Sequence, residues 1–506
     1  MMRGMDMTDD ACYRVLLTRD ARFDGRLFTG VKTTGIYCRP ICPARTPKRE
    51  NVRFFDTATA AQAAGFRPCL RCRPEASPDL AAWRGTSNTV SRALALIDTG
   101  ALDAEDVEAL ADRLGVGERQ LRRLFRRHLG ASPVAVAQTR RVLLAKQLIH
   151  QTRLPMTEVA LASGFGSVRR FNETFQALYD RPPRELRRSN AEDVSALGGD
   201  WITLRLPYRA PYDWDGLTAF LAMRAIEGVE SVTPGRYARS IAIGEDRGLL
   251  VVTPGAGDEL KVSVRFPKIA ALPLIIGRVR RVFDLAADPD QIGACLATDP
   301  HLAPLVAARP GLRVPGAWDG FELAVRAILG QQITVVAAKN LAGRITRESG
   351  EALQDGQGDQ IDGVTHVFPG AERLADADLS GLPMPRARSK SLESLARAVV
   401  ADPHLFGPKR GLDEAIATLK ALPGVGEWTA QYIAMRQMRE PDAFPAADVG
   451  LMRALEDADG VRPTAARMLA RAEAWRPWRA YAALHLWASL APNPSQKEIA
   501  DVKAAA

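Results

Sequence analysis

The sequence predicts a multidomain protein that is mainly α with α+β parts, and three observations carry this prediction. The chain has 506 residues, which is too many for one hydrophobic core. Apolar residues recur at three- and four-residue spacing from about 88 to 188 and from about 288 to 490, as in amphipathic helices. Between these stretches, short segments of alternating apolar residues are separated by Gly and Pro, which predicts an antiparallel sheet.

The composition excludes several classes of protein. Hydrophobic residues make up 46% of the chain and charged residues 25%, as in ordinary soluble proteins. No apolar run approaches the roughly 18 residues that a membrane span needs, and the N-terminus lacks the apolar core of a secretory signal. Six cysteines in so long a chain favour a reducing compartment over a disulfide scaffold. We therefore expect a cytoplasmic protein with no membrane partner.

The positive charge is concentrated near the N-terminus. Residues 1–190 hold 32 Lys and Arg against 20 Asp and Glu, net +12, whereas the remainder holds 36 against 39, net −3. This asymmetry predicts an N-terminal part that binds a polyanion. A basic surface that is merely solvated is the alternative.

The first predicted domain, 8–80, contains four clustered cysteines. Cys38 and Cys42 form one close pair, and Cys69 and Cys72 form the other. Two such pairs suit tetrahedral Zn²⁺, because each pair supplies adjacent corners of the site. The spacing leaves open whether the site only holds the fold or also contains a reactive thiolate.

The segments "FTGVKTTGIYCRPICPARTPKRENVRFF" and "AAGFRPCLRCRPE" resemble the N-terminal domain of the Ada family of bacterial alkylation-response proteins. The resemblance implies one Zn²⁺ bound by the four cysteines. It also implies that Cys38 accepts a methyl group irreversibly from a DNA methylphosphotriester, as a suicidal methyltransferase. Six nearby basic residues are then candidates for phosphate contacts: Arg39, Arg45, Lys48, Arg67, Arg71 and Arg73.

The second predicted domain, 88–188, contains two similar helix–turn–helix units. Residues 107–133 combine an apolar helix, a Gly-Val-Gly turn and an arginine-rich helix, and residues 156–183 repeat the scheme. The units resemble the AraC/XylS-type DNA-binding domain, with Gly117 where a Ser commonly caps the recognition helix. This resemblance implies promoter DNA and RNA polymerase as partners; a plain helical bundle is the alternative. The arginines expected to face DNA are Arg119, Arg122, Arg123, Arg169 and Arg170.

A small polar linker is predicted at 189–200, followed by the sheet domain at 201–285 and a helical domain at 286–492. Within the helical domain, "LPGVG" at 422–426 is typical of a helix–hairpin–helix turn. Gly424 and Gly426 would let backbone amides approach a DNA phosphate, and the hairpin carbonyls are a possible site for a monovalent cation. Many loops contain "PGVG", so this motif alone leaves an ordinary turn open.

An aspartate that opens a helix about 20 residues after the hairpin favours a helix–hairpin–helix motif over an ordinary turn. Together with "AFPAADVGLMRAL" and "WRPWRAYAALHLW", it resembles the AlkA-type 3-methyladenine DNA glycosylases, which carry a TBP-like antiparallel sheet domain. The resemblance implies that Asp448 is the catalytic carboxylate. It also implies that Trp428, Tyr432 and Trp487 line the base pocket, and that Gln332 lies at the wedge position. The alternatives are a helix-capping role for Asp448 and core roles for the aromatic residues.

Trp428 stands where strand-nicking relatives have a Schiff-base lysine, so we expect a monofunctional glycosylase. The whole sequence thus predicts a monomeric, nucleoid-associated protein that combines a methyl-accepting regulator with a glycosylase II-type hydrolase acting on double-stranded DNA. One alternative is an activator whose glycosylase-like half only binds damaged DNA. Another is a repair enzyme without a regulatory role.

Overall fold

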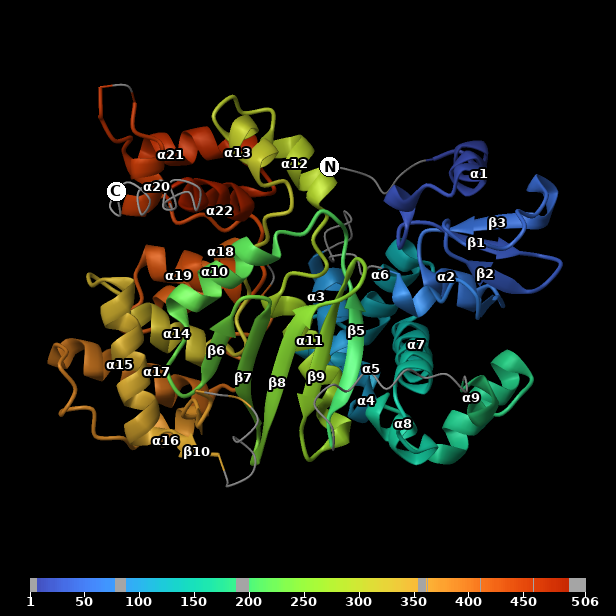
Figure 1. The fold of residues 1–506 in the computed structure, drawn as a ribbon, viewed down its shortest axis with the longest axis horizontal. Coiled ribbons are helices and arrows are strands. Elements are labelled where there is room, and N and C mark those ends of the chain that lie inside the picture. The colour runs from blue at the N-terminus through green and yellow to red at the C-terminus, as the bar shows by residue number, and fades with distance from the viewer. Residues whose placement is uncertain are drawn as a thin grey trace, which may run out of the picture.

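The computed structural model describes residues 7–77, 88–187, 200–353, 361, 363–409, 411–457 and 459–490. The predicted linker, 189–200, lies outside these ranges except for its last residue. The described ranges contain 22 α-helices and 11 β-strands, and the predicted fold class is confirmed. The largest sheet among the described residues has five strands. Figure 1 shows it at the centre, with the N-terminal elements on one side and the C-terminal helices on the other.

A small mixed sheet organises the cysteine-containing module. Its strand order is β3-β1-β2-β4, with β2 and β4 parallel and the other neighbours antiparallel. A left-handed residue, Gly35 (φ +62°), closes the β1–β2 hairpin. The elements are α1 (Asp9–Thr18), β1 (Phe28–Val31), β2 (Ile36–Cys38), β3 (Val52–Phe55), α2 (Ala58–Ala63) and β4 (Arg67–Pro68).

Seven helices form the next part of the chain and contain both predicted helix–turn–helix units. They are α3 (Asn88–Asp98), α4 (Ala101–Ala104), α5 (Val107–Arg113), α6 (Glu118–Leu129), α7 (Pro133–Gln151), α8 (Met156–Ala162) and α9 (Val168–Tyr179). The apolar residues Leu121 and Phe125 of α6, and Phe171 and Phe175 of α9, are fully buried. The spacing of apolar residues in the sequence therefore predicted which faces of α6 and α9 are buried.

The central sheet has the strand order β5-β9-β8-β7-β6 and is antiparallel throughout. Its strands are β5 (Ile202–Pro207), β6 (Glu230–Thr233), β7 (Arg236–Ile243), β8 (Asp246–Pro254) and β9 (Glu259–Arg265), and α10 (Trp214–Arg224) lies between β5 and β6 in the chain. The antiparallel sheet that the alternating segments predicted is present. One of its strands, β6, is a four-residue edge strand, which is too short to show a clear alternation.

The remaining helices follow the central sheet in the chain, and all of them except the first contribute to the largest apolar core among the described residues. They are α11 (Leu272–Val282), α12 (Pro289–Leu296), α13 (Leu302–Ala308), α14 (Gly320–Leu329), α15 (Val335–Ser349), α16 (Ala371–Ala375), α17 (Arg386–Ala401), α18 (Leu412–Lys420), α19 (Glu427–Arg436), α20 (Val449–Ala454), α21 (Ala465–Ala472) and α22 (Arg479–Ser489). A short ladder of β10 (Glu351–Ala352) and β11 (His366–Val367) lies within this part. Among the described residues, no helix is long and apolar enough to cross a membrane.

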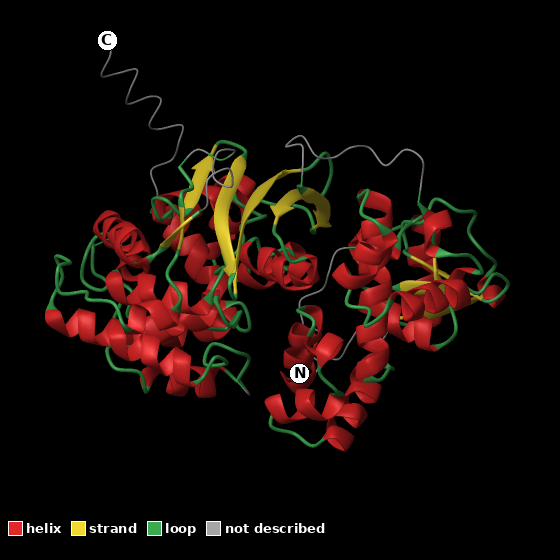
Figure 2. Cartoon of the chain, turned by 90° about the horizontal axis from the view of Figure 1, so that it is seen from below, coloured by secondary structure: helices red, strands yellow, loops and turns green. Residues whose placement is uncertain are grey.

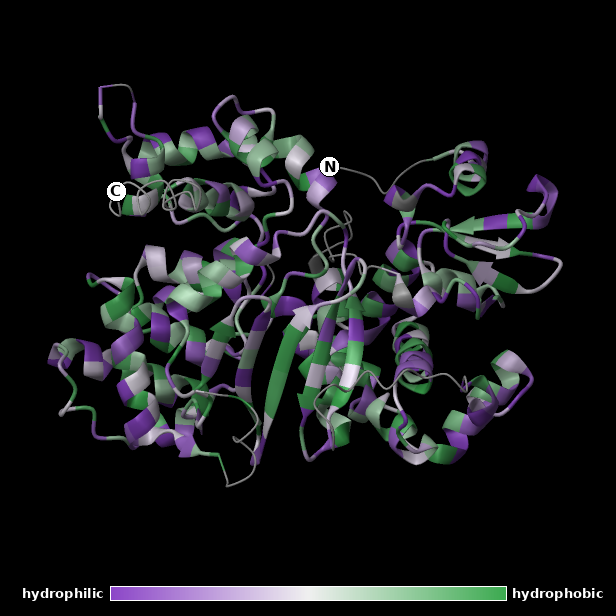
Figure 3. Ribbon diagram, viewed as in Figure 1, coloured by the Kyte–Doolittle hydropathy of each residue, from purple (hydrophilic) through white to green (hydrophobic). Residues whose placement is uncertain are grey.

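The second helix–turn–helix unit and the central sheet share one hydrophobic core. Leu148 of α7 and Phe175 of α9 belong to the same buried cluster as Leu204 of β5 and Val262 of β9. Figure 3 shows the hydrophobic colour along the central strands, and Figure 2 shows helices on both flanks of the sheet. The two halves are therefore packed against each other in this structure.

Candidate functional site

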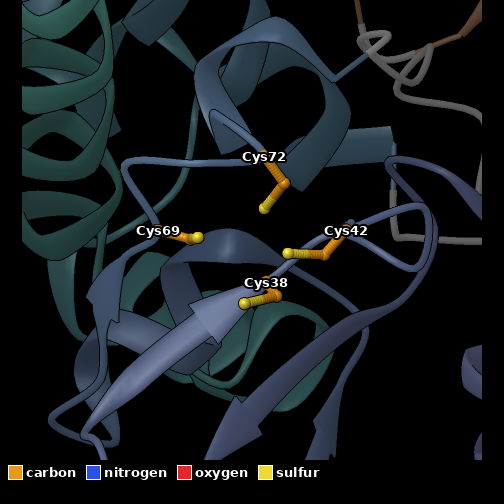
Figure 4. A group of neighbouring side chains, drawn as sticks. All are labelled: Cys38, Cys42, Cys69 and Cys72. Atoms are coloured by element: carbon orange, nitrogen blue, oxygen red, sulfur yellow. The ribbon is translucent and has the colours of Figure 1, made fainter. Parts of the chain in front are cut away.

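The four cysteines meet at one edge of the small sheet. Because β2 and β4 are parallel neighbours, their carboxyl ends lie together, which brings Cys38 at the end of β2 beside Cys69, the residue after β4. Cys42 and Cys72 complete the group, with all four Sγ atoms within 4.8 Å of one another. Figure 4 shows the four sulfur atoms directed toward a common centre.

The cluster is shielded, but unequally. Cys42, Cys69 and Cys72 are buried, whereas Cys38 is only half-buried. The backbone amide of Arg39 donates to Cys72 Sγ and that of Arg71 donates to Cys69 Sγ, each at 3.3 Å. Such donors stabilise negative charge on sulfur. Cys38 is therefore the most exposed of the four cysteine residues.

The donor set fits a zinc ion. Hydrogen bonding from Cys38 lowers the pKa of Cys42 to about 7 and places the pKa of Cys69 far below its ordinary value. Hydrogen bonding with Cys42 raises the pKa of Cys38 above its ordinary value. Four thiolates this close repel one another, so all four are ionised together only around a cation. Four clustered sulfurs without oxygen ligands are typical of Zn²⁺.

The arginine beside the nucleophile candidate faces inward, contrary to its proposed phosphate contact. The Arg39 guanidinium pairs with the buried Asp24 carboxylate and donates to the Cys72 carbonyl at 3.1 Å. The side chains of Arg39 and Asp24 are both nearly buried, so Arg39 stabilises the cysteine cluster and does not face solvent. Among the other basic candidates, Arg45, Lys48 and Arg71 are exposed.

The predicted DNA-facing arginines lie on the two recognition helices. On α6, Arg119 and Arg123 are exposed, whereas Arg122 is half-buried and pairs with Glu118. Both arginines of α9 are exposed, and Arg169 pairs with Glu173 at 2.8 Å. Gly117 is the N-cap of α6 and adds no side-chain cap. These exposed ion pairs are weak, so they are readily exchanged for phosphate or base contacts.

The "LPGVG" motif forms the turn between α18 and α19. Gly424 is left-handed (φ +80°), and a Cβ there would lie 2.2 Å from Ser391 Oγ, so the packing against α17 requires glycine. Gly426 is the N-cap of α19, with open space where a Cβ would be. Gln331 Nε2 donates to the Gly424 carbonyl at 2.8 Å. The hairpin is therefore held by the Gln331 side chain at Gly424, and it has open space at Gly426. A phosphate needs such open space to reach the backbone amides.

Asp448 opens α20, and three donors hold its carboxylate. Trp428 Nε1 donates to Oδ2 at 2.7 Å, Trp487 Nε1 donates to Oδ1 at 2.9 Å, and the Leu451 amide also donates to Oδ1 at 2.9 Å. Asp448 is thus a helix cap, as the alternative interpretation held, and it is also bound by two predicted pocket residues. The predicted aspartate and tryptophans are brought together in one site.

A cavity of about 630 Å³ lies beside this carboxylate and is lined by Trp428, Tyr432, Asp448 and Trp487. Its volume is in the range of small-ligand sites. Trp428 stacks on Tyr432 with ring centroids 5.1 Å apart and planes 11° apart. Trp487 stands at 65° to Tyr432 with centroids 6.5 Å apart. A base sandwiched in parallel between Trp487 and Tyr432 therefore requires Trp487 to rotate.

The predicted wedge residue lies at a loop tip near the cavity. Gln332 is exposed and left-handed (φ +58°) in the loop between α14 and α15. The next residue, Ile333, is 36% exposed and lines the cavity. An exposed apolar side chain is also suited to filling a gap in a base stack.

Several cavity residues were not predicted from the sequence. Phe220 and Arg224 project from α10 of the sheet domain, and Arg436 projects from α19. The four-residue spacing of Phe220 and Arg224 places them on one face of α10. This spacing was the only available signal, because their distance in sequence from Asp448 gave no reason to group them with it.

Family models match four consecutive parts of the chain. They are the metal binding domain of Ada at 11–75, a helix-turn-helix domain at 110–189, the AlkA N-terminal domain at 203–319, and the HhH-GPD superfamily base excision DNA repair protein at 325–480. A Mycobacterium tuberculosis protein, "Probable bifunctional transcriptional activator/DNA repair enzyme AlkA", is 41% identical over 96% of this chain and 97% of its own length. The chain belongs to this bifunctional AlkA family.

Two Escherichia coli proteins match parts of this chain. "DNA-3-methyladenine glycosylase 2" is 37% identical over 56% of the chain and 95% of its own length. "Bifunctional transcriptional activator/DNA repair enzyme Ada" is 36% identical over 33% of the chain and 45% of its own length. The predicted resemblances are confirmed, and so is the zinc site of Cys38, Cys42, Cys69 and Cys72.

Proposed function

We propose that the chain repairs alkylated DNA in two ways and regulates transcription in response to the damage. The proposal rests on one observation: a single chain holds a half-buried cysteine in a four-sulfur cluster and a carboxylate fixed beside a large aromatic cavity. The proposed domains are 8–80, 88–188, 201–285 and 286–492, with a linker at 189–200. We place its action in the cytoplasm, on the nucleoid.

In the N-terminal half, Cys38 is the methyl acceptor. Bound Zn²⁺ keeps the thiols deprotonated at neutral pH. Cys38 Sγ forms a bond to the methyl carbon while the bond from that carbon to the phosphotriester oxygen breaks, so that a phosphodiester anion leaves. The product is a stable thioether, so each molecule reacts once.

The same reaction switches promoter binding. A zinc ion with four thiolates carries a formal charge of about −2, and one methylation changes it to about −1. Phosphate is then repelled less, so DNA affinity rises. The arginines of α6 and α9 then enter the major groove, and RNA polymerase is the further partner. The chain acts as a monomer.

In the C-terminal half, Asp448 assists cleavage of the N-glycosidic bond of alkylated bases such as 3-methyladenine. The base is flipped into the aromatic cavity, and the carboxylate stabilises the positive charge that develops on the sugar or activates water. Trp428 has no amine to form a Schiff base, so an abasic site is the product. Gly424 and Gly426 bind a phosphate, and the hairpin carbonyls would hold a monovalent cation. Gln332 fills the gap that the flipped base leaves in the base stack.

One experiment tests both activities on the full-length protein. DNA carrying labelled methylphosphotriesters and alkylated bases is incubated with wild type, Cys38→Ala and Asp448→Asn, with Cys295→Ala as a control outside the cluster. Mass spectrometry of the protein measures methyl uptake, and chromatography measures base release. We expect Cys38→Ala to lose only uptake and Asp448→Asn to lose only release. Uptake by Cys38→Ala or wild-type release by Asp448→Asn would contradict the corresponding assignment, and wild type without release supports a lesion-binding activator instead.

A further inference from the structure

The cavity beside Asp448 has a cationic wall. Seven cationic side chains and three carboxylates line it. Part of this charge is neutralised in place, because Arg239 pairs with Glu322 at 2.7 Å and Arg326 pairs with Glu230 at 2.5 Å. The cavity as a whole nevertheless keeps an excess of positive charge. An aromatic box built only for cationic bases would not need that excess.

Three lining guanidiniums, those of Arg224, Arg313 and Arg436, take part in none of the ion pairs between described residues, and two of them, Arg224 and Arg436, lie close together. Both lie near the Phe220 ring, with their Cζ atoms 3.7 Å and 5.0 Å from its centroid. Both also lie near the Tyr432 hydroxyl. Burial would raise the pKa of Tyr432, but Arg436 and Arg224 lower it below its ordinary value. The part of the cavity beside Phe220 and the Tyr432 hydroxyl is therefore positively charged.

The two arginines differ in how much of their hydrogen-bonding capacity is used. Arg436 is buried, and it donates to the carbonyls of Pro315 and Gly316 and to Tyr432 Oη. Arg224 is only half-buried, and its hydrogen bonds to described residues, to Phe220 O at 3.2 Å and Met223 Sδ at 3.8 Å, both use Nη1. A guanidinium has five N–H donors. These two bonds and the interaction with the Tyr432 hydroxyl leave part of the donor capacity of Arg224 unused at the cavity wall.

This wall distinguishes damaged bases by charge and by their polar edges. A guanidinium donates to a carbonyl oxygen or an unprotonated ring nitrogen, but it repels a base that carries a positive charge. The aromatic rings favour that cationic base. A neutral oxo-purine has a carbonyl acceptor, whereas 3-methyladenine in DNA is cationic and has an amino group at the corresponding edge. The two lesions therefore respond oppositely to this arginine.

We propose that Arg224 is a specificity-determining residue that extends the glycosylase toward neutral, carbonyl-bearing damaged bases by donating to their acceptor atoms. This inference rests on the proposed glycosylase function of the Asp448 site. Arg224 reads the base edge and takes no part in bond cleavage. The same contact weakens the binding of cationic bases.

The test compares two lesions in one protein. Base release is measured for wild type and Arg224→Met on duplexes containing a single hypoxanthine and on DNA containing 3-methyladenine. Because a hydrogen bond to a charged donor is lost, we expect hypoxanthine release by Arg224→Met to fall about 10- to 100-fold. We expect 3-methyladenine release to be unchanged or faster. Arg224→Lys, which keeps the charge without the planar fork, should release hypoxanthine at an intermediate rate.

Control variants distinguish a role of Arg224 in specificity from a loss of folding. They also distinguish a failure of this role from a failure of the proposed glycosylase function. Arg373→Met, at an exposed arginine on α16, should match wild type on both lesions. Asp448→Asn should lose both activities, and a wild type inactive on both lesions would refute the glycosylase proposal rather than the role of Arg224. Equal losses on the two lesions in Arg224→Met, with an unchanged unfolding temperature, would show that Arg224 only supports the pocket. Unchanged hypoxanthine release would overturn the proposal directly.

Discussion

At the scale of residues, three hydrogen bonds fix the orientation of the Asp448 carboxylate. Each of its oxygens accepts from an indole, and one also accepts from the Leu451 amide. Hydrogen bonds of this kind fix the direction of a carboxylate before substrate arrives, so little reorganisation is needed in the transition state. The indole of Trp487 has two roles here, since it orients Asp448 and also forms a wall of the cavity.

Glycine at position 450 allows this arrangement. A Cβ there would lie 2.9 Å from Asp448 Oδ1 and 3.3 Å from Trp487 Cδ1, so one of the two side chains would have to move. We expect Gly450→Ala to lower kcat for base release about 10- to 100-fold, since small displacements of catalytic groups cost this much. We expect methyl uptake by Cys38 to be unchanged. Single-turnover base release measures the first and mass spectrometry the second.

Gly381→Ala is the matched control for Gly450→Ala. Gly381 has open space at its Cβ position and does not have a left-handed backbone, so the added methyl group meets nothing. Wild-type base release by Gly450→Ala would mean that the contact between Trp487 and Asp448 is not needed for the reaction.

The sequence predicted the residues that belong to compact motifs and missed those contributed from elsewhere. The cysteine pairs and the aspartate after the hairpin have fixed spacing, so the order of residues along the chain is enough to identify them. Arg224 and Gly450 could not be identified in this way, because their importance depends on which atoms of other elements lie within a few ångströms. Arg39 was misjudged for the same reason, since its partner Asp24 is 15 residues away and not linked to it by any motif.

At the scale of elements, α7 holds the N-terminal half together. It joins the two helix–turn–helix units, and its buried Lys146 pairs with Glu75 at 2.7 Å and donates to the Cys69 carbonyl at 3.2 Å. On the same helix, Gln147 donates to the Arg205 carbonyl of β5 at 2.9 Å. The period of the sequence predicted this helix. Its contacts to both neighbours could not be predicted, because an isolated helical pattern does not show what covers each face.

Removing Lys146 should loosen the cysteine module. Lys146→Met leaves the Glu75 carboxylate buried without a partner, which costs about 3–5 kcal/mol. We expect faster amide hydrogen exchange in β4 and the following residues up to 77, and faster loss of zinc to a chelator. Exchange measured by mass spectrometry and zinc release followed with a chromophoric chelator report the two effects.

The double variant Lys146→Met with Glu75→Gln serves as the control for this ion pair. It removes the uncompensated charge, so most of the lost protection should return. If the double variant were as unstable as the single one, the effect would come from packing around Lys146 rather than from the ion pair.

At the scale of the whole molecule, the cysteine module is docked onto the sheet domain of the other half. Arg209, 8% exposed, donates to the carbonyls of Arg22 and Asp24. Arg26 pairs with Asp288. Through the ion pair of Asp24 with Arg39 and the hydrogen bond of Arg39 to the Cys72 carbonyl, this contact is continuous with the zinc site. Neither half alone would reveal such a connection.

Breaking this contact should release the module without unfolding either half. Arg209→Met removes the donor of the Arg22 and Asp24 carbonyls and the charge beside Asp288. The Asp24 bond is the buried one, and leaving that carbonyl without a donor costs about 1–3 kcal/mol. We expect faster hydrogen exchange at residues 21–27 and a larger radius of gyration by small-angle X-ray scattering. Base release should be unchanged, because Arg209 is not among the residues lining the cavity.

Lys268→Met, at an exposed ion pair of the same domain, should change none of these quantities. If Arg209→Met left the radius of gyration and the exchange of residues 21–27 at wild-type values, the shared core of the second helix–turn–helix unit and the sheet would suffice to hold the halves together.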